Sequence, residues 1–99
     1  MSWTGYYIQC GQKHQMNLGN INFQPGPGAI IKGRGTDEVG SFSLDGSFSP
    51  NEPLCRFTKH YDGQHSVYYE GRYDQSTNSI SGHYGLIPGA NDGEFKMQH

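Results

Sequence analysis

Large side chains and glycines recur at every second position along most of this 99-residue chain. A repeat of two is typical of β-strands, because successive side chains of a strand point to opposite faces of the sheet. No part of the chain shows the i, i+3, i+4, i+7 spacing of an amphipathic helix. The sequence therefore predicts an all-β protein in which rings and glycines share one inner face. The clearest alternating segments are 3–7, 31–37, 42–48, 57–61, 67–73 and 80–84.

The chain divides into eight strand candidates separated by turn residues. They cover residues 2–9, 14–24, 29–34 (with an extension as far as 36), 40–49, 54–61, 66–73, 79–86 and 94–98. We expect a bulge at Gly19-Asn20 and a hairpin turn at Asp62-Gly63. Short successive strands joined by tight turns form an up-and-down sheet, and closure removes its exposed edges. We therefore predict a single domain over residues 1–99, a small antiparallel up-and-down barrel of about eight strands.

Charge and hydropathy argue against several classes of partner. The 7 Lys and Arg residues and 9 Asp and Glu residues are scattered singly and give a net charge of −2. Without a basic stripe to follow a phosphate backbone, we expect no nucleic-acid partner. No apolar run approaches the roughly 18 residues of a membrane helix, so we expect no membrane partner. The chain shows neither the charged nor the apolar region of a signal peptide, and we expect a cytoplasmic protein.

The two cysteines, Cys10 and Cys55, have opposite parity in the strand pattern. Side chains on opposite faces of a sheet cannot reach the Cβ distance of a disulfide, so we expect two free thiols. Free thiols fit a reducing compartment, in agreement with the expected location.

Polar side chains on the inner face are the candidates for function. Asp37 and Lys59 have inner parity, together with several tyrosines. Lys and Asp are almost never fully buried unless they are paired, so we expect a Lys59–Asp37 pair bridged by tyrosine hydroxyls. The pair could be structural and fix the strand register, or it could set the polarity of a ligand cavity. Catalysis would require a lowered Lys59 pKa or a tyrosine acting as a general acid.

Other reactive side chains give weaker signals. His60, Asp62 and His65 lie around one hairpin turn and could contribute to a metal site, but further ligands are not evident. We expect them to be solvated, and we expect no metal and no cofactor. The sequence contains no Gly-x-Ser-x-Gly, His-Glu-x-x-His or Cys-x-x-Cys motif. We therefore assign no catalytic residue, and an enzyme is the least favoured class.

Segment 65–73, with the sequence HSVYYEGRY, resembles the central strand of avidin and streptavidin, in which a His-Ser stretch leads to an aromatic residue and Gly-x-Tyr. The opening WTGYY at 3–7 resembles the first strands of the wider calycin group, which includes avidins, lipocalins and fatty-acid-binding proteins. The resemblance implies an eight-stranded barrel with a ligand at its open end.

The chain departs from avidins in two respects. Avidins wall their pocket with several tryptophans, whereas this chain has only Trp3, so biotin is not carried over. A full match would also make Ser66 and Tyr68 ligand contacts, whereas the alternation of side chains places Val67 and Tyr69 inside. Only the calycin-like architecture is retained as an expectation.

We expect a non-enzymatic barrel that binds a small, polar or partly aromatic molecule in its interior. The predicted ligand-binding residues are Tyr7, Asp37, Lys59, Tyr61, Tyr69 and Tyr84. The alternative is a protein- or carbohydrate-binding module whose barrel is filled by side chains. If Tyr6, Ile8 and Tyr68 cluster on the outer face, they would form an apolar patch for a homodimer.

Overall fold

Eight antiparallel strands make up the structure, a computed structural model that describes residues 3–19, 21 and 25–99. In chain order they are β1 (Trp3–Gln9), β2 (Gln12–Leu18), β3 (Ile30–Asp37), β4 (Ser41–Phe48), β5 (Leu54–Tyr61), β6 (Ser66–Asp74), β7 (Ser79–Gly85) and β8 (Gly93–Gln98). Among the described residues, no helix has the length and apolar character needed to span a membrane.

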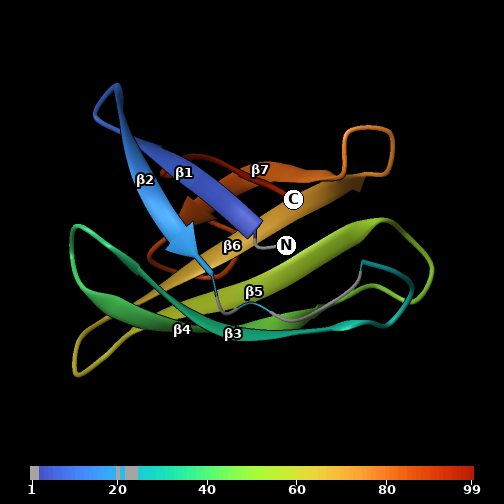
Figure 1. Cartoon of the computed structure of the whole chain (residues 1–99), viewed down its shortest axis with the longest axis horizontal. Helices are drawn as coiled ribbons and strands as arrows, with labels where there is room; N and C mark the ends of the chain where they lie inside the picture. Colours follow the sequence, from blue (N-terminus) through green and yellow to red (C-terminus); the bar gives the residue numbers. More distant parts are fainter. Residues whose placement is uncertain (1–2, 20, 22–24) are drawn as a thin grey trace.

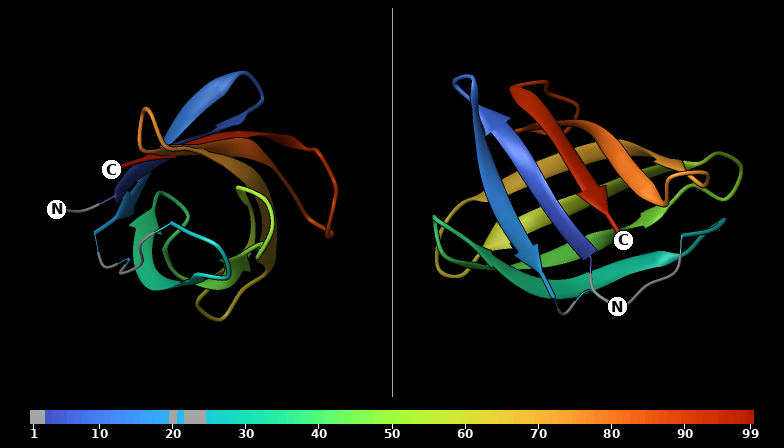
Figure 2. Two further views of the ribbon diagram at one scale, coloured as in Figure 1. Left: turned by 90° about the vertical axis from the view of Figure 1, so that its right-hand side faces the viewer. Right: turned by 45° about the horizontal axis from the view of Figure 1, so that its top comes forward.

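The strands close into a barrel in which each one pairs with the next in the chain (Figure 1). The circle is completed by β8, which pairs with β1 along residues 4–7. Every strand therefore has a paired neighbour on each side. Figure 2 shows the strands tilted around a common axis, with β1 and β8 side by side. The predicted all-β, up-and-down barrel of eight strands is confirmed.

A two-residue turn joins β1 to β2. Cys10 and Gly11 have φ angles of 52° and 75°. Two successive positive φ angles are typical of the type I′ turn, whose twist matches that of a hairpin. Because two residues suffice for this turn, β2 begins at Gln12 and not at His14 as predicted from the sequence.

The other boundaries agree closely with the predicted ones. β3 extends to Asp37, one residue beyond the extension to 36 that the sequence predicts, and the turn at Asp62-Gly63 joins β5 to β6 as predicted. β2 ends at Leu18, so the predicted continuation of the second strand is wrong at Gly19 and Ile21, where the amide of Ile21 donates to the backbone oxygen of Leu18 in a turn. Positions 20 and 22–24, and with them the predicted bulge at Gly19-Asn20, lie outside the described residues.

The inner face carries the rings, as the alternation predicts. Its buried side chains are Trp3, Tyr7, Met16, Leu18, Ile31, Phe42, Leu44, Phe48, Cys55, Phe57, Lys59, Tyr61, Val67, Tyr69, Ile80, Tyr84, Phe95 and Met97. The thiols are both free, with Cys10 exposed and Cys55 buried, as predicted.

Two inner glycines mark places where neighbouring strands approach closely. A Cβ atom on Gly46 would lie 2.1 Å from the backbone oxygen of Arg56, and one on Gly82 would lie 2.0 Å from that of Glu70. Backbone atoms cannot move aside as a flexible side chain can, so these positions require a residue without a side chain.

The join between β2 and β3 has the fewest paired residues in the barrel. Within the described part of the chain, two residue pairs connect these strands, Met16 with Asp37 and Asn17 with Thr36. By contrast, seven pairs connect β1 to β2. We refer to this join as the β2–β3 seam, and it lies beside the candidate functional site.

Candidate functional site

Lys59 lies at the centre of the site, on the inner face of β5. Its ammonium forms an ion pair with Asp37 at the end of β3, with 2.9 Å between Nζ and Oδ2. The two side chains are 1% and 0% exposed. Tyr61, also on β5, donates a hydrogen bond of 2.5 Å from its hydroxyl to the same carboxylate oxygen. The predicted Lys59–Asp37 pair, bridged by a tyrosine hydroxyl, is therefore confirmed.

Aromatic rings surround the ammonium of Lys59. Four ring centroids lie between 4.5 and 5.3 Å from its nitrogen, and they belong to Tyr7, Tyr61, Phe42 and Tyr69. Cation–π attraction of this kind is strongest where water is excluded, and it offsets part of the free energy lost when the charge is buried. We define the lysine cage as Lys59, its partner Asp37, these four rings and Met16.

Two members of the cage were not predicted as site residues, Phe42, which was expected on the inner face only, and Met16. Met16 lies beside both Lys59 and Tyr69. Its sulfur accepts a hydrogen bond of 3.5 Å from Lys59 Nζ and one of 3.8 Å from the hydroxyl of Tyr69. A signal was present, because Met16 and Leu18 alternate with polar residues at 13, 15 and 17. That alternation places both side chains inside the barrel, where the structure finds them buried.

Burial and the ion pair shift the ionisation of the cage. Burial lowers the pKa of Lys59, and the contact with Asp37 opposes this shift without cancelling it. Burial by itself raises the pKa of Asp37, but hydrogen bonds from Tyr61 and Lys59 outweigh it, so that pKa lies below its ordinary value. Burial, followed by interactions with Asp37, raises the pKa of Tyr61 and Tyr69 well above the ordinary value. The geometry fits an ammonium–carboxylate pair among neutral phenols.

Five of the six predicted ligand-binding residues belong to the lysine cage: Tyr7, Asp37, Lys59, Tyr61 and Tyr69. Tyr84 lies beside the cage, with ring centroids 5.8 Å from Tyr7 and 5.6 Å from Tyr69. Its hydroxyl donates to the backbone oxygen of Ile8 at 2.5 Å. All six side chains are buried and pack against one another. Their role in binding a ligand stays a prediction.

Two histidines lie over tyrosines of the cage. His14 stacks on Tyr7 with 5.0 Å between ring centroids, and it also pairs with Glu38. His65, in the turn between β5 and β6, lies against Tyr61 with 5.3 Å between ring centroids.

His60, Asp62 and His65 make separate contacts. His60 shares a hydrogen bond with Ser66, and Asp62 pairs with Arg34. Within residues 3–19, 21 and 25–99, no three His, Cys, Asp or Glu side chains gather in a way that could hold a metal ion. The described residues therefore offer no candidate metal centre at this turn.

A surface groove of about 500 Å³ lies over the β2–β3 seam. Its lining includes Met16 and Asp37, and both of these side chains contact Lys59. Both side chains are almost fully buried, so they separate the groove from Lys59.

The outer residues Tyr6, Ile8 and Tyr68 line two different pockets. Tyr6 and Ile8 line one with residues of β7 and β8, whereas Tyr68 lines another over β4 to β7. In the barrel, β7 and β8 lie between β6 and β1. A homodimer built on these residues stays a prediction.

No protein-family model, curated protein or solved structure matches this chain significantly.

Proposed function

We propose that the barrel binds a small molecule in the lysine cage and does not act as an enzyme. The observation that carries this proposal is the weakness of the acceptors around the buried donors. Among the described residues, Lys59 donates to Asp37 and to the thioether of Met16, and Tyr69 donates to that thioether alone. A thioether is a weak acceptor, so protons of an ammonium and of a phenol are poorly satisfied. A ligand oxygen placed there would accept from both.

These donors define the chemistry of the ligand. It carries a carbonyl or amide oxygen for Lys59 and Tyr69, and a flat apolar part for the rings around them. Asp37 already balances the charge of Lys59. A neutral ligand is therefore favoured over an anion, which would leave an uncompensated charge in a buried site.

Met16 occupies the place that such a ligand would take. Methionine is flexible and fills irregular gaps, so its side chain can move aside at a low energetic cost. It belongs to the β2–β3 seam, where two residue pairs hold the strands together, and it lines the groove above the seam. A ligand that enters from this groove would displace one side chain without breaking a long ladder of backbone hydrogen bonds.

Binding is favoured over catalysis because the polar groups of the cage that could transfer a proton are bound to one another. Lys59 donates to Asp37, and the hydroxyl of Tyr61 donates to the same carboxylate. Burial raises the pKa of Tyr61 further from neutrality. General acid–base catalysis works best when the pKa of the group lies near the working pH.

A thermal-shift and NMR titration with benzamide and coumarin tests the proposal. Toluene, which lacks an acceptor, and benzoate, which adds a charge, serve as matched controls. We expect benzamide and coumarin to raise the Tm with concentration and to shift the resonances of Met16, Lys59 and Tyr69. Toluene and benzoate should do so more weakly.

Variants locate the binding site. Met16→Ala enlarges the space beside Lys59 and should bind benzamide more tightly than the wild type. Met97→Ala removes a buried methionine of β8 that lies outside the cage. This variant should bind benzamide no more tightly than the wild type. If neither benzamide nor coumarin affects the wild type or Met16→Ala, the interior is a filled core and the proposal is wrong.

A further inference from the structure

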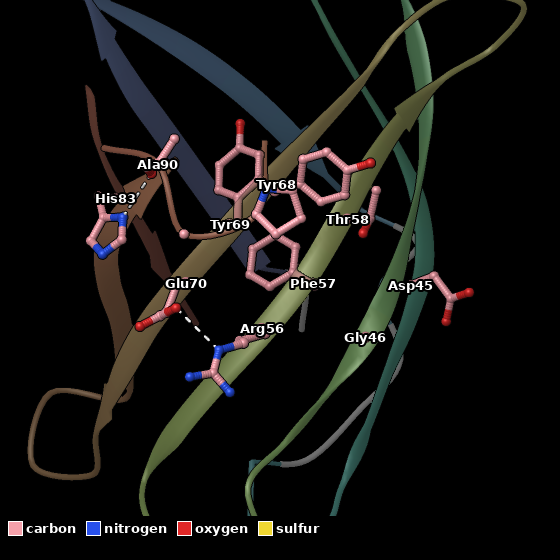
Figure 3. A pocket seen from close by; sticks show the side chains of 12 residues that line it. Asp45, Gly46, Arg56, Phe57, Thr58, Tyr68, Tyr69, Glu70, His83 and Ala90 are labelled. Atoms are coloured by element: carbon pink, nitrogen blue, oxygen red, sulfur yellow. Dashed lines mark hydrogen bonds and ion pairs between the residues drawn. The ribbon is translucent and has the colours of Figure 1, made fainter. Parts of the chain in front are cut away.

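A second pocket lies on the outside of the barrel, over strands β4 to β7 (Figure 3). Its volume is about 420 Å³, within the roughly 300–1,000 Å³ of small-molecule sites. Two rows of outward side chains cross the strands here: Asp45, Thr58 and Tyr68 in one, and Arg56, Glu70 and His83 in the other.

The turn between β7 and β8 forms one wall of this pocket. Nδ1 of His83 donates a hydrogen bond of 3.2 Å to the backbone oxygen of Ala90. Ala90 also packs so closely on β7 that a Cβ atom on Gly85 would lie 2.5 Å from its own Cβ. Figure 3 shows His83 and Ala90 together on one side of the pocket and Asp45 on the other. The turn thus folds back over β7 and gives depth to a surface that is otherwise convex.

The first row offers polar groups that the protein itself does not use. Asp45 is paired in register with Thr58, and Thr58 with Tyr68, so the three lie side by side on adjacent strands. Among the described residues, the carboxylate of Asp45 and the hydroxyls of Thr58 and Tyr68 have no hydrogen-bond partner. Tyr68 is half-buried and adds an aromatic ring to this row.

The second row contributes an ion pair whose hydrogen-bonding groups are only partly used. Nε of Arg56 lies 3.1 Å from Oε1 of Glu70, and the pair is drawn as a dashed line in Figure 3. The remaining guanidinium protons can donate, and the second carboxylate oxygen can accept. Two carboxylates and one guanidinium give the pocket a small negative charge, which disfavours phosphates and other anions.

We propose that this outer pocket binds the neutral sugar ring of an oligosaccharide. A sugar presents hydroxyls that both donate and accept, and the pocket supplies both kinds of partner at Asp45, Thr58 and the Arg56–Glu70 pair. A sugar ring also has an apolar C–H face, for which the ring of Tyr68 provides a contact surface. This site lies on the outer face of the barrel wall, and Tyr69 of the lysine cage is among the residues that line it.

The test is an NMR titration of the full chain with cellotriose, maltotriose and triacetylchitotriose, each at millimolar concentration. We expect at least one of them to give saturable shifts confined to residues 45, 56–58, 68–70 and 83–90. Tyr68→Ala and Asp45→Ala should weaken that binding by about tenfold or more, as expected when a central contact is removed. Asp45 is exposed, so its variant tests the site without endangering the fold.

Tyr6→Ala is the matched control, because Tyr6 is an outer tyrosine that lines a different pocket. It should leave the affinity unchanged. The proposal is overturned if no trisaccharide saturates, if Tyr6→Ala weakens binding as much as Tyr68→Ala, or if inorganic phosphate binds this pocket and the sugars do not.

Discussion

The ammonium of Lys59 and the carboxylate of Asp37 lie 2.9 Å apart in a part of the barrel that solvent does not reach. The two residues come from strands that are not neighbours, because β4 lies between β3 and β5. Their contact therefore links two strands that no backbone ladder joins. Removing one partner leaves the other charge buried and uncompensated.

Asp37→Asn is expected to lower the free energy of unfolding by about 3–5 kcal/mol, because the charge of Lys59 then stays buried without a counter-ion. Adding Lys59→Met should recover most of this loss, since an uncharged, flexible side chain suits the aromatic surroundings. Urea unfolding, followed by the fluorescence of Trp3, compares the variants. A double variant no more stable than Asp37→Asn would contradict a buried pair of charges.

Acid is expected to destabilise the protein partly through Asp37. The folded state holds the pKa of Asp37 below the ordinary value of 3.8, so between the two values the unfolded chain binds more protons. This stabilisation is complete above the ordinary pKa and is lost as the pH falls through the folded pKa. Asp37→Asn should therefore lose less stability over that interval than the wild type. Denaturant titrations at several acidic pH values measure the free energy of unfolding of the wild type and of Asp37→Asn. If the two free energies fall in parallel as the pH is lowered, the acid sensitivity belongs to other carboxylates.

Gly82→Ala is expected to destabilise the barrel by about 3 kcal/mol, at the upper end of the range for overpacking. The added Cβ atom would lie 2.0 Å from the backbone oxygen of Glu70 and 2.6 Å from Cα of Gly71. Gly26→Ala is the control, because nothing lies within 4 Å of its new Cβ atom. Thermal denaturation should show a much larger loss for Gly82→Ala, and equal losses would refute the close approach of β6 and β7.

The two thiols are expected to differ in reactivity. Cys10 is exposed, whereas burial raises the pKa of Cys55 to about 12. Because the thiolate is the reactive form, a disulfide reagent at neutral pH should modify one thiol in the native protein and the second only after unfolding. Cys10→Ser should abolish the fast reaction. Rapid modification of Cys55 in the native state would mean that the interior opens readily.

Amide protons at the β2–β3 seam are expected to exchange faster than those between β5 and β6. Few paired residues hold the seam closed, so it should open locally at a smaller free-energy cost than the rest of the barrel. Native-state hydrogen exchange read by NMR at Asn17 and Thr36 measures this opening. Protection there equal to that of Phe57 would show that the seam is no easier to open than a full ladder, and entry of a ligand beside Met16 would lose its support.

The architecture could be predicted from the sequence because a strand with one buried face leaves little freedom in its register. The same parity argument places Lys59 and Asp37 inside, and burial then demands that they pair. Met16 was missed because the residues of the second predicted strand, 14–24, were not assigned to an inner and an outer face. Its contact with Lys59 is also made across the barrel, and no local pattern encodes it.

The outer pocket could not be predicted in the same way. The pocket is deep because the turn between β7 and β8 folds back onto β7, where Ala90 packs against Gly85. This is a tertiary contact. The alternation identifies Tyr68 as an outward residue, but it gives no reason to expect a wall beside it. Strand periodicity thus specifies on which face of the sheet a side chain lies. Whether that face carries a pocket depends on the loops that pack over it.

The pairing of β8 with β1 means that the ring of strands has no obligatory first member. A short linker from β8 to β1, with the chain cut at the exposed Asp62-Gly63 turn, would leave every ladder in place, and circular permutation is best tolerated at such turns. The new termini would lie near His65, whose ring contacts Tyr61. A fluorophore attached at these termini would report changes in packing around the buried ammonium of Lys59.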